Sequence, residues 1–466
     1  MIHLSIGEIA EAIGGKVIGT ANAEGLLVTG SVETDSRLVR PGALFFARPG
    51  EVTDGHLFIG AALESGAVAA VVDHAVDENI AQIVVADVTA ALGQLAKYVL
   101  ARIREVSALT VIGITGSNGK TTTKNMLRAI LSQVGETIAP IESYNNEVGA
   151  PISILKAGFD TKFLVVELGA GGPGSIAYLA DIARPDLAVM LKVGLAHVGE
   201  FGGIEGTAKI KGELAESLSA KNLFIGNADD GYIRDMPTKA KQVWFGTAPD
   251  AGYRATDLQL DITGTRFEMH WPSGEVDRIT LQILGEHHVM NALAACAAAD
   301  QLGVSHQLTK VALESMPLAE RWRMQLTNRS DGVSVINDAY NASPDSMKAA
   351  LQTLAQLGKS GRRTIAILGE MAELGEFSRE QHDALGRIVV RLNIDQLVVV
   401  GAAAKLIHMG AEQEGSWGGE SKFFDSIAEA LTYVRGMLVA GDIVLVKSSK
   451  SANLRHLGDD LLEVQP

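Results

Sequence analysis

The sequence has 466 residues, of which 47% are hydrophobic and 20% are charged, which is enough apolar material for several cores. At roughly 150 residues per domain, this length predicts about three domains. The formal net charge of −15 argues against a nucleic-acid partner, because contacts with phosphate groups need clustered Lys and Arg.

The one cysteine, Cys296, cannot form an internal disulfide, which is typical of a reducing compartment. It lies in an alanine-rich segment, so we interpret it as a small buried hydrophobe rather than a reactive thiol. The N-terminus has no basic region followed by an apolar core, and no apolar run approaches about 18 residues. We therefore expect a cytoplasmic protein that does not insert stably into a membrane. We also expect it to be a monomer.

Residues 1–88 mix short helical and strand patterns, which predicts a small N-terminal α/β domain. Apolar spacing predicts a helix over 6–13, and the apolar runs 66–73 and 83–87 are typical of buried strands. The polar segment 35–46 and the turn at 54–56 have the composition of loops. A helix over 89–103 is expected to lead into the next domain.

Residues 111–123 read VIGITGSNGKTTT, an apolar β-branched run followed by a glycine-rich turn. The helical pattern after the turn, over 123–131, completes the strand–loop–helix context of a phosphate-binding loop. The strict eight-residue pattern is not met, because Ile114 stands where its first glycine should be, and a chance turn is the alternative. We predict an ATP site formed by Gly116, Ser117, Asn118, Gly119, Lys120, Thr121 and Thr122, with Lys120 reaching the terminal phosphates and Thr121 ligating Mg²⁺.

Strand and helix patterns alternate through the rest of the chain, which predicts open α/β domains over 89–318 and 319–466. Two polar–apolar alternations, at 254–270 and 278–284, predict an antiparallel hairpin or small sheet at the edge of the central sheet. The overall prediction is α/β: a central, mostly parallel P-loop-type sheet with helices on both faces, followed by a Rossmann-like C-terminal domain. Further strands are expected at 162–167, 186–191, 222–226, 333–336, 364–368, 396–400 and 442–446.

Polar residues follow several of these strands, at the edge where open α/β sheets bind ligands. Glu167 can face the phosphate loop and hold Mg²⁺, although a helix-capping or solvated role is the alternative. His197 follows another strand, where a lone histidine is more often structural than a ligand. Lys209 and Lys211 begin a helical segment and could form an ordinary charged face.

Two further loops are rich in hydrogen-bonding groups. Asn145 and Asn146 precede a Gly–Ala–Pro turn, and residues 337–346 read NDAYNASPDS before a helix. Their amides and Asp338 could contact a ribose or substrate. Helix capping alone could explain Ser343 and Asp345.

The segments TGSNGKTT (115–122), NNEVGAP (145–151) and VELGA (166–170) resemble the Mur ligase family. The N-terminal segment 35–56 and the segment 338–346 resemble the member of that family that joins D-alanyl-D-alanine to UDP-N-acetylmuramoyl-tripeptide. The resemblance extends over essentially the whole chain. It implies a three-domain, ATP-dependent ligase of peptidoglycan precursor synthesis that forms a peptide bond through an acyl phosphate.

The resemblance also implies roles for particular residues. Thr121 and Glu167 would hold one Mg²⁺ and His197 a second. Lys211 would be carbamylated, with Lys209 as the competing choice, and this turns a cation into an oxygen ligand. Lys120, Lys211 and His197 would thus be the catalytic residues. The implied ATP contacts outside the loop are Asn291, Arg323 and Asp338, and the implied substrate contacts are Ser36, Arg37, Asn145, Asn146, Tyr340 and Asn341.

The sequence departs from the family pattern at residues 447–450, which read KSSK, and at 321–323, which read RWR. Two other functions stay open: a Mur-type or folate ligase that adds a single amino acid, and a nucleotide switch. The N-terminal segment 35–37 disfavours the folate activity, and the chain has no Asn–Lys–x–Asp motif for guanine.

Overall fold

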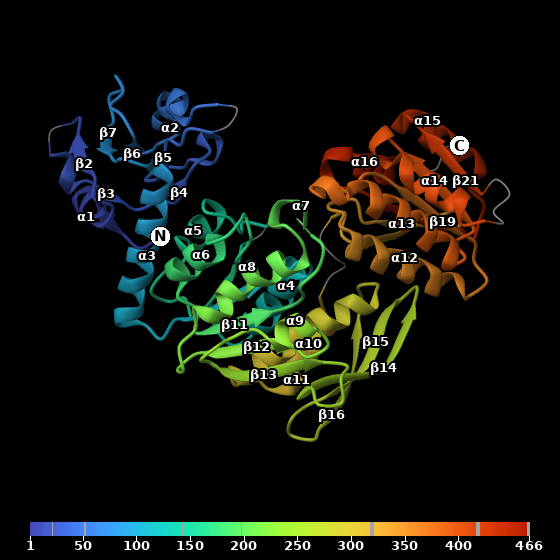
Figure 1. The fold of residues 1–466 in the computed structure, drawn as a ribbon. Helices are drawn as coiled ribbons and strands as arrows, with labels where there is room; N and C mark the ends of the chain where they lie inside the picture. Colours follow the sequence, from blue (N-terminus) through green and yellow to red (C-terminus); the bar gives the residue numbers. More distant parts are fainter. Residues whose placement is uncertain are drawn as a thin grey trace.

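The computed structural model describes residues 1–20, 22–50, 53–140, 143–196, 198–316, 321–415 and 420–463. Within these ranges the strands form three large sheets and a small antiparallel pair, β1 (Leu4–Ser5) with β3 (Leu27–Val28). Figure 1 shows the N-terminal and C-terminal sheets, each with its helices, on either side of a central body. Within the described part of the chain, no helix combines the length and the apolar character needed to cross a bilayer.

The central sheet has nine strands in the described part of the chain. Seven consecutive strands are parallel; β15 then pairs antiparallel with β14, and β16 pairs antiparallel with β15. The spatial order is β9 (Thr137–Ile138), β10 (Phe163–Glu167), β8 (Thr110–Thr115), β11 (Leu187–Met190), β12 (Leu223–Asn227), β13 (Lys241–Gly246), β14 (Tyr253–Asp261), β15 (Gly264–His270) and β16 (Val276–Leu281). This arrangement confirms the predicted parallel sheet with an antiparallel edge.

Helices cover both faces of the central sheet, as expected for parallel strands whose two faces are buried. One face packs against α4 (Lys120–Leu131), α10 (Glu286–Gln301) and α11 (His306–Glu314). The other packs against α3 (Val88–Val106), α5 (Gly149–Ile154), α6 (Ser175–Ala183) and α8 (Ile204–Glu216). Two short helices, α7 (Val198–Phe201) and α9 (Gly231–Arg234), belong to connecting segments. Cys296 lies fully buried in α10, as predicted.

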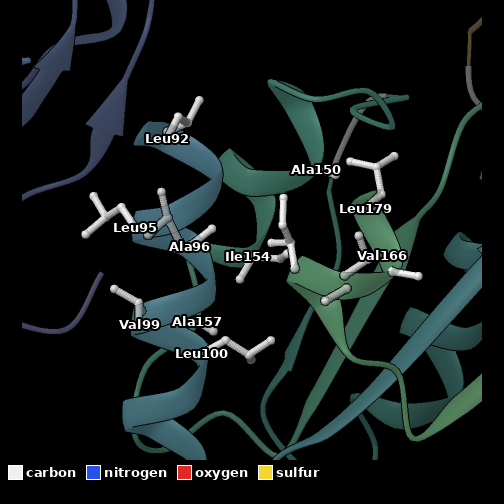
Figure 2. Close-up of a cluster of buried hydrophobic side chains, with 14 of the residues drawn as sticks. Leu92, Leu95, Ala96, Val99, Leu100, Ala150, Ile154, Ala157, Val166 and Leu179 are labelled. Carbon is white, nitrogen blue, oxygen red and sulfur yellow. The ribbon is translucent and has the colours of Figure 1, made fainter. Parts of the chain in front are cut away.

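The N-terminal sheet is joined to the central body by α3. Its five described strands run in the order β2 (Lys16–Ile18), β7 (Ala81–Val84), β6 (Ala69–Val72), β5 (Leu44–Phe46) and β4 (Val32–Glu33), with α1 (Ile6–Ala12) and α2 (Ile59–Glu64) beside them. Leu92 and Val99 of α3 belong to one continuous core that includes Ile6 of α1, Leu44 of the N-terminal sheet and Val166 of the central sheet. Figure 2 shows side chains of this helix directed toward α5. The first two sheets therefore share a core.

The C-terminal sheet has separate cores on its two faces. Its six described strands run in the order β17 (Gln325–Asn328), β18 (Ser334–Asn337), β22 (Ile443–Lys447), β19 (Thr364–Leu368), β20 (Gln396–Val400) and β21 (Ser421–Phe424), and all neighbours except β17 and β18 are parallel. One face carries α12 (Pro344–Gly358), α13 (Ser378–Arg391) and α14 (Lys405–Gln413), and the other α15 (Ile427–Met437) and α16 (Leu454–Asp460). This is the α/β domain that the alternating pattern predicts.

Some local predictions were wrong. The polar segment 35–46 contains the buried strand β5 as well as the short helix Ser36–Leu38, so it is not a plain loop. Helix α4 begins at Lys120, three residues before the expected start, and α8 begins at Ile204, before the two lysines. The proposed domain ranges 1–88, 89–318 and 319–466 stay a prediction, and the second boundary lies outside the described residues.

Candidate active site

The phosphate loop connects β8 to α4 through two glycines with positive φ, Gly116 (154°) and Gly119 (89°). Gly119 is the N-cap residue of α4, and among the described residues no side chain caps this end of the helix. The first amides of α4, together with the positive end of its dipole, can therefore bind an anion in the loop. A Cβ at Gly119 would lie 2.2 Å from Oδ1 of Asn291, so only glycine allows this close approach.

Lys120 begins α4, and its Nζ donates a hydrogen bond of 2.7 Å to the carbonyl of Gly116. Burial lowers its pKa; Glu167 opposes this effect and Arg323 adds to it. Since the ammonium folds back on the loop, a phosphate bound there lies within reach of the same group.

Glu167 ends β10 and faces the start of α4, because β10 and β8 are adjacent parallel strands. Its Oε2 accepts a hydrogen bond of 3.3 Å from Oγ1 of Thr121. Its Oε1 lies 3.2 Å from Nζ of Lys124, and both side chains are fully buried. Among the described residues Oε1 accepts no well-directed hydrogen bond, so the Lys124 contact is an ion pair only. A buried carboxylate with this free lone-pair capacity beside a hydroxyl is the oxygen set that Mg²⁺ prefers.

A cavity of about 360 Å³ opens beside the loop and is lined by Lys120, Asn145, Asn146 and Lys211, together with other residues. Lys211 is only 2% exposed. Burial lowers its pKa well below the ordinary value of a lysine, and the charge of Lys120 adds to the effect. Lys209 points from the same helix to the solvent. The charged-face interpretation is therefore wrong for Lys211 and correct for Lys209.

A second cavity, of about 690 Å³, lies between the central and C-terminal bodies. The central body contributes Asn118, Gly119 and Asn291, and α12 contributes Asp345 and Lys348, among other residues. The phosphate loop thus forms part of the walls of both cavities. A nucleotide in the second cavity would place its phosphates at the first.

The C-terminal body reaches the loop through Arg323. Its Nη2 donates a hydrogen bond of 3.1 Å to Oγ of Ser143, and that hydroxyl lies 3.0 Å from Oγ1 of Thr121. The guanidinium lies over the ring of Tyr340, 4.1 Å from its centroid. Only the side chain of Ser143 therefore separates Arg323, a cation of the C-terminal body, from Thr121, the proposed metal ligand of the central body.

Family models match three consecutive parts of the chain: "Mur ligase family, catalytic domain" at residues 29–108, "Mur ligase middle domain" at 114–299, and "Mur ligase, glutamate ligase domain" at 322–450. A relative from Mycobacterium leprae (strain TN), a UDP-N-acetylmuramoyl-tripeptide–D-alanyl-D-alanine ligase, is 40% identical over 99% of each chain. The chain belongs to the Mur ligase family.

Solved structures of the family have the same architecture as this Mur ligase. MurF from Acinetobacter baumannii has a TM-score of 0.89 at 32% identity, with 99% of each chain covered. The MurF ligase of Thermotoga maritima, solved in complex with ADP, has a TM-score of 0.81 at 27% identity and covers 93% of this chain and 97% of its own.

The implied ATP contacts of the C-terminal body of this Mur ligase are already paired. Oδ2 of Asp338 accepts a hydrogen bond of 2.5 Å from Nζ of Lys447, and Oδ1 accepts one of 2.9 Å from the amide of Met324. Lys447 also donates to the carbonyl of Asn341 at 3.0 Å. The KSSK segment therefore belongs to this cluster through Lys447, while the contact of Asp338 with a ribose stays a prediction.

Other predicted residues lie elsewhere in this Mur ligase or outside the described part. His197 is outside the described residues. Ser36 and Arg37 lie in the N-terminal domain, where Arg37 is exposed and pairs with Asp35 at 2.5 Å, and neither lines the two cavities. The side chain of Asn341 is exposed, and its Oδ1 accepts a hydrogen bond from the amide of Ala342.

Sequence reasoning missed two residues of this site. Lys124 lies one helical turn after Lys120 on the buried side of α4, and a lysine at an apolar-face position was the available signal. For Asp345 the sequence left helix capping as a sufficient explanation, yet its carboxylate contacts the central body. No local pattern could have indicated that contact.

Proposed function

We propose that this chain joins the amine of D-alanyl-D-alanine to the terminal carboxylate of a UDP-N-acetylmuramoyl-tripeptide and cleaves ATP to ADP and phosphate. The full-length similarity to the ligase of Mycobacterium leprae supports the substrates. The single observation of the structure that carries the proposal is the phosphate loop, which lines two cavities and faces a buried carboxylate and a buried lysine.

The reaction first forms an acyl phosphate, which the dipeptide amine then attacks with release of phosphate. Two anions, the substrate carboxylate and the γ-phosphate, must approach each other in the first step. Lys120, Arg323 and the amides at the start of α4 supply positive charge around the point where the anions meet. Such fixed charges in a water-poor site are the largest contribution that these groups can make to the rate.

Mg²⁺ would be held by Thr121 and Glu167, and a second ion by His197 and a carbamylated Lys211. Bound there, Mg²⁺ supplies neutralisation of the phosphate charge and orientation of the phosphate oxygens. The ion pair of Lys124 with Oε1 of Glu167 leaves Oε2 directed at Thr121.

The buried state of Lys211 favours the carbamate. Carbon dioxide reacts with a neutral amine, and burial, which lowers the pKa of Lys211, favours that neutral form. Lys209 is exposed to solvent, whereas Lys211 is buried and lines the first cavity, so Lys211 is the better candidate of the two.

The remaining roles concern the substrates. Asn145 and Asn146 lie in the first cavity, where they would bind the peptide end, and Ser36 and Arg37 would bind the uridine diphosphate end. Tyr340 and Asn341 would contact substrate from the C-terminal body. We further propose that the protein is a monomer, which light scattering on the purified chain can test.

Incubation with ATP and UDP-muramoyl-tripeptides, with either D-alanyl-D-alanine or single amino acids, tests the activity by phosphate release. We expect release only with the tripeptide and the dipeptide together. Release with a single amino acid would identify a different ligase, and release without any acceptor would indicate a nucleotide switch.

Lys120→Ala is the matching variant for the site. We expect it to abolish phosphate release while the melting temperature changes little, because the change removes one hydrogen bond of the amine, to the carbonyl of Gly116. Lys97→Ala, which removes an exposed ion pair with Asp181, is the control and should remain active. Substantial ligation by the Lys120 variant would show that the site has been misplaced.

A further inference from the structure

Asp345 lies in the first turn of α12, but its carboxylate points to the central body. Oδ2 accepts a hydrogen bond of 2.8 Å from the amide of Leu195, and Oδ1 lies 3.0 Å from Nζ of Lys192. Both partners belong to the loop that follows β11. Every hydrogen bond that this carboxylate makes among the described residues crosses between the bodies, while Ser343 caps the helix.

The same contact region includes the phosphate loop. Oγ of Ser343 donates a hydrogen bond of 3.3 Å to Oδ1 of Asn118, and the amide of Gly194 donates one of 2.9 Å to Oγ of Ser117. The side chain of Leu195 packs against the core of the C-terminal body. The start of α12, the loop after β11 and the phosphate loop are therefore connected at one place.

This connection has a direct relation to the nucleotide. Asp345 lines the cavity of about 690 Å³, whose walls also include Gly119 and Asn291 from the central body. The cavity exists only while the two bodies are together. A residue that favours the closed arrangement therefore raises the affinity for any ligand that needs both walls.

We propose that Asp345 is a positioning residue that holds the C-terminal domain closed over the phosphate loop, through Leu195 and Lys192. The inference rests on the proposed function, since it assigns the shared cavity to ATP. The carboxylate adds charge-assisted hydrogen bonding to a contact that Leu195 stabilises by apolar packing. Asp345 itself does not touch the reacting atoms.

Gly194 offers a sharp test of the contact. A Cβ at this position would lie 2.4 Å from Oδ2 of Asp345 but 3.5 Å from the next residue, Ser117. Gly194 has no positive φ, so alanine is acceptable to the backbone itself. Gly194→Ala should thus disturb closure only when Asp345 is present.

The experiment measures ADP affinity by calorimetry and the radius of gyration by X-ray scattering, neither of which needs the ligase substrates. For Asp345→Ala we expect ADP to bind about tenfold more weakly, the change typical of one lost charge-assisted hydrogen bond. The nucleotide-free variant should be more extended than the wild type, and excess ADP should restore compaction. In turnover assays the KM for ATP should rise while kcat at saturation stays within about twofold, since saturating ATP restores closure.

Two comparisons decide the outcome. Gly194→Ala should weaken ADP binding in the wild type and have less than about a twofold effect in the Asp345→Ala background. Asp383→Ala, which removes an ion pair of 2.8 Å within α13, is the control and should leave ADP affinity unchanged. If Asp345→Ala does not fold, Asp345→Asn and Lys192→Met each remove the ion pair and should weaken ADP binding in the same direction.

Unchanged ADP affinity and size in these variants, or equal effects of Gly194→Ala in both backgrounds, would overturn the proposal. A wild type that binds ADP and closes but does not ligate any tripeptide would refute the proposed function alone.

Discussion

Burial lowers the pKa of Lys211 well below the ordinary value of a lysine, because water no longer solvates the charged ammonium. Lys211→Ala should therefore remove the proposed carbamate and lower phosphate release by about 10- to 100-fold, as expected for loss of a group that holds a metal. Added formate or acetate should restore part of the activity. With ¹³C-bicarbonate, NMR should show a carbamate signal in the wild type that is absent from this variant.

Lys209→Ala is the matched control, since Lys209 lies in the same helix but is exposed. It should retain both the activity and the NMR signal. An active Lys211→Ala enzyme would instead favour a structural role for this lysine.

A buried histidine gives the stability of the protein a pH dependence. Burial lowers the pKa of His288 well below its ordinary value, with smaller contributions from His287 and nearby cations. As the pH falls through the unfolded pKa of about 6.5, the unfolded chain takes up a proton that the folded chain refuses, so stability decreases. His288→Gln should reduce the slope of unfolding free energy between pH 7 and pH 5, measured by urea titration. An unchanged slope would show that His288 does not contribute.

At the scale of a helix, two serine caps allow a matched comparison. Ser343 caps α12 and Ser426 caps α15, each by accepting a backbone hydrogen bond within its own helix. Each Ser→Ala change should cost about 1 kcal/mol of stability in urea unfolding. Only Ser343→Ala should also weaken ADP binding, because this hydroxyl contacts Asn118 of the phosphate loop. Equal ADP affinities in the two variants would contradict that distinction.

Elements with strong local patterns could be predicted from the sequence. The unit of β8, loop and α4 follows from a β-branched run, two glycines and a helical period, and Ser343 with Pro344 marks the start of α12. Several strands were missed: β1 to β5, β9, β13, β17 and β21. All of these except β13 have only two to four residues and depend on their neighbours in the sheet.

The candidate site shows the same limit. Glu167 could be predicted because it ends an apolar strand beside the loop. The burial of Lys211 and the contact of Asp345 with Leu195 could not be predicted. Lys211 lies more than 80 residues from the phosphate loop in the sequence, and so does Asp345 from Leu195. Both features therefore depend on packing between distant segments.

At the scale of the molecule, the tip of the β14–β15 hairpin connects two bodies. Leu260 and Ile262 pack against the core of the C-terminal body. Replacing both with alanine should cost about 2–3 kcal/mol, given that each is partly buried. Calorimetry should then resolve a C-terminal transition at lower temperature from that of the central body. Val276→Ala, at an exposed position of the same sheet, is the control and should leave the calorimetric profile of the wild type unchanged. A single unfolding transition in the double variant would show that the hairpin does not couple the two bodies.

The shared core around α3 has a consequence for the choice of substrate. Because Leu92, Leu95 and Val99 lie in the core that the N-terminal and central sheets share, we expect the two sheets to keep a constant separation when the C-terminal domain closes. A precursor anchored by its nucleotide in the first domain would then present its far end to the phosphate loop at a fixed reach. Helix α3 would then set the length of peptide that the enzyme accepts. The terminal carboxylate of a peptide one residue shorter or longer would not reach the phosphate loop.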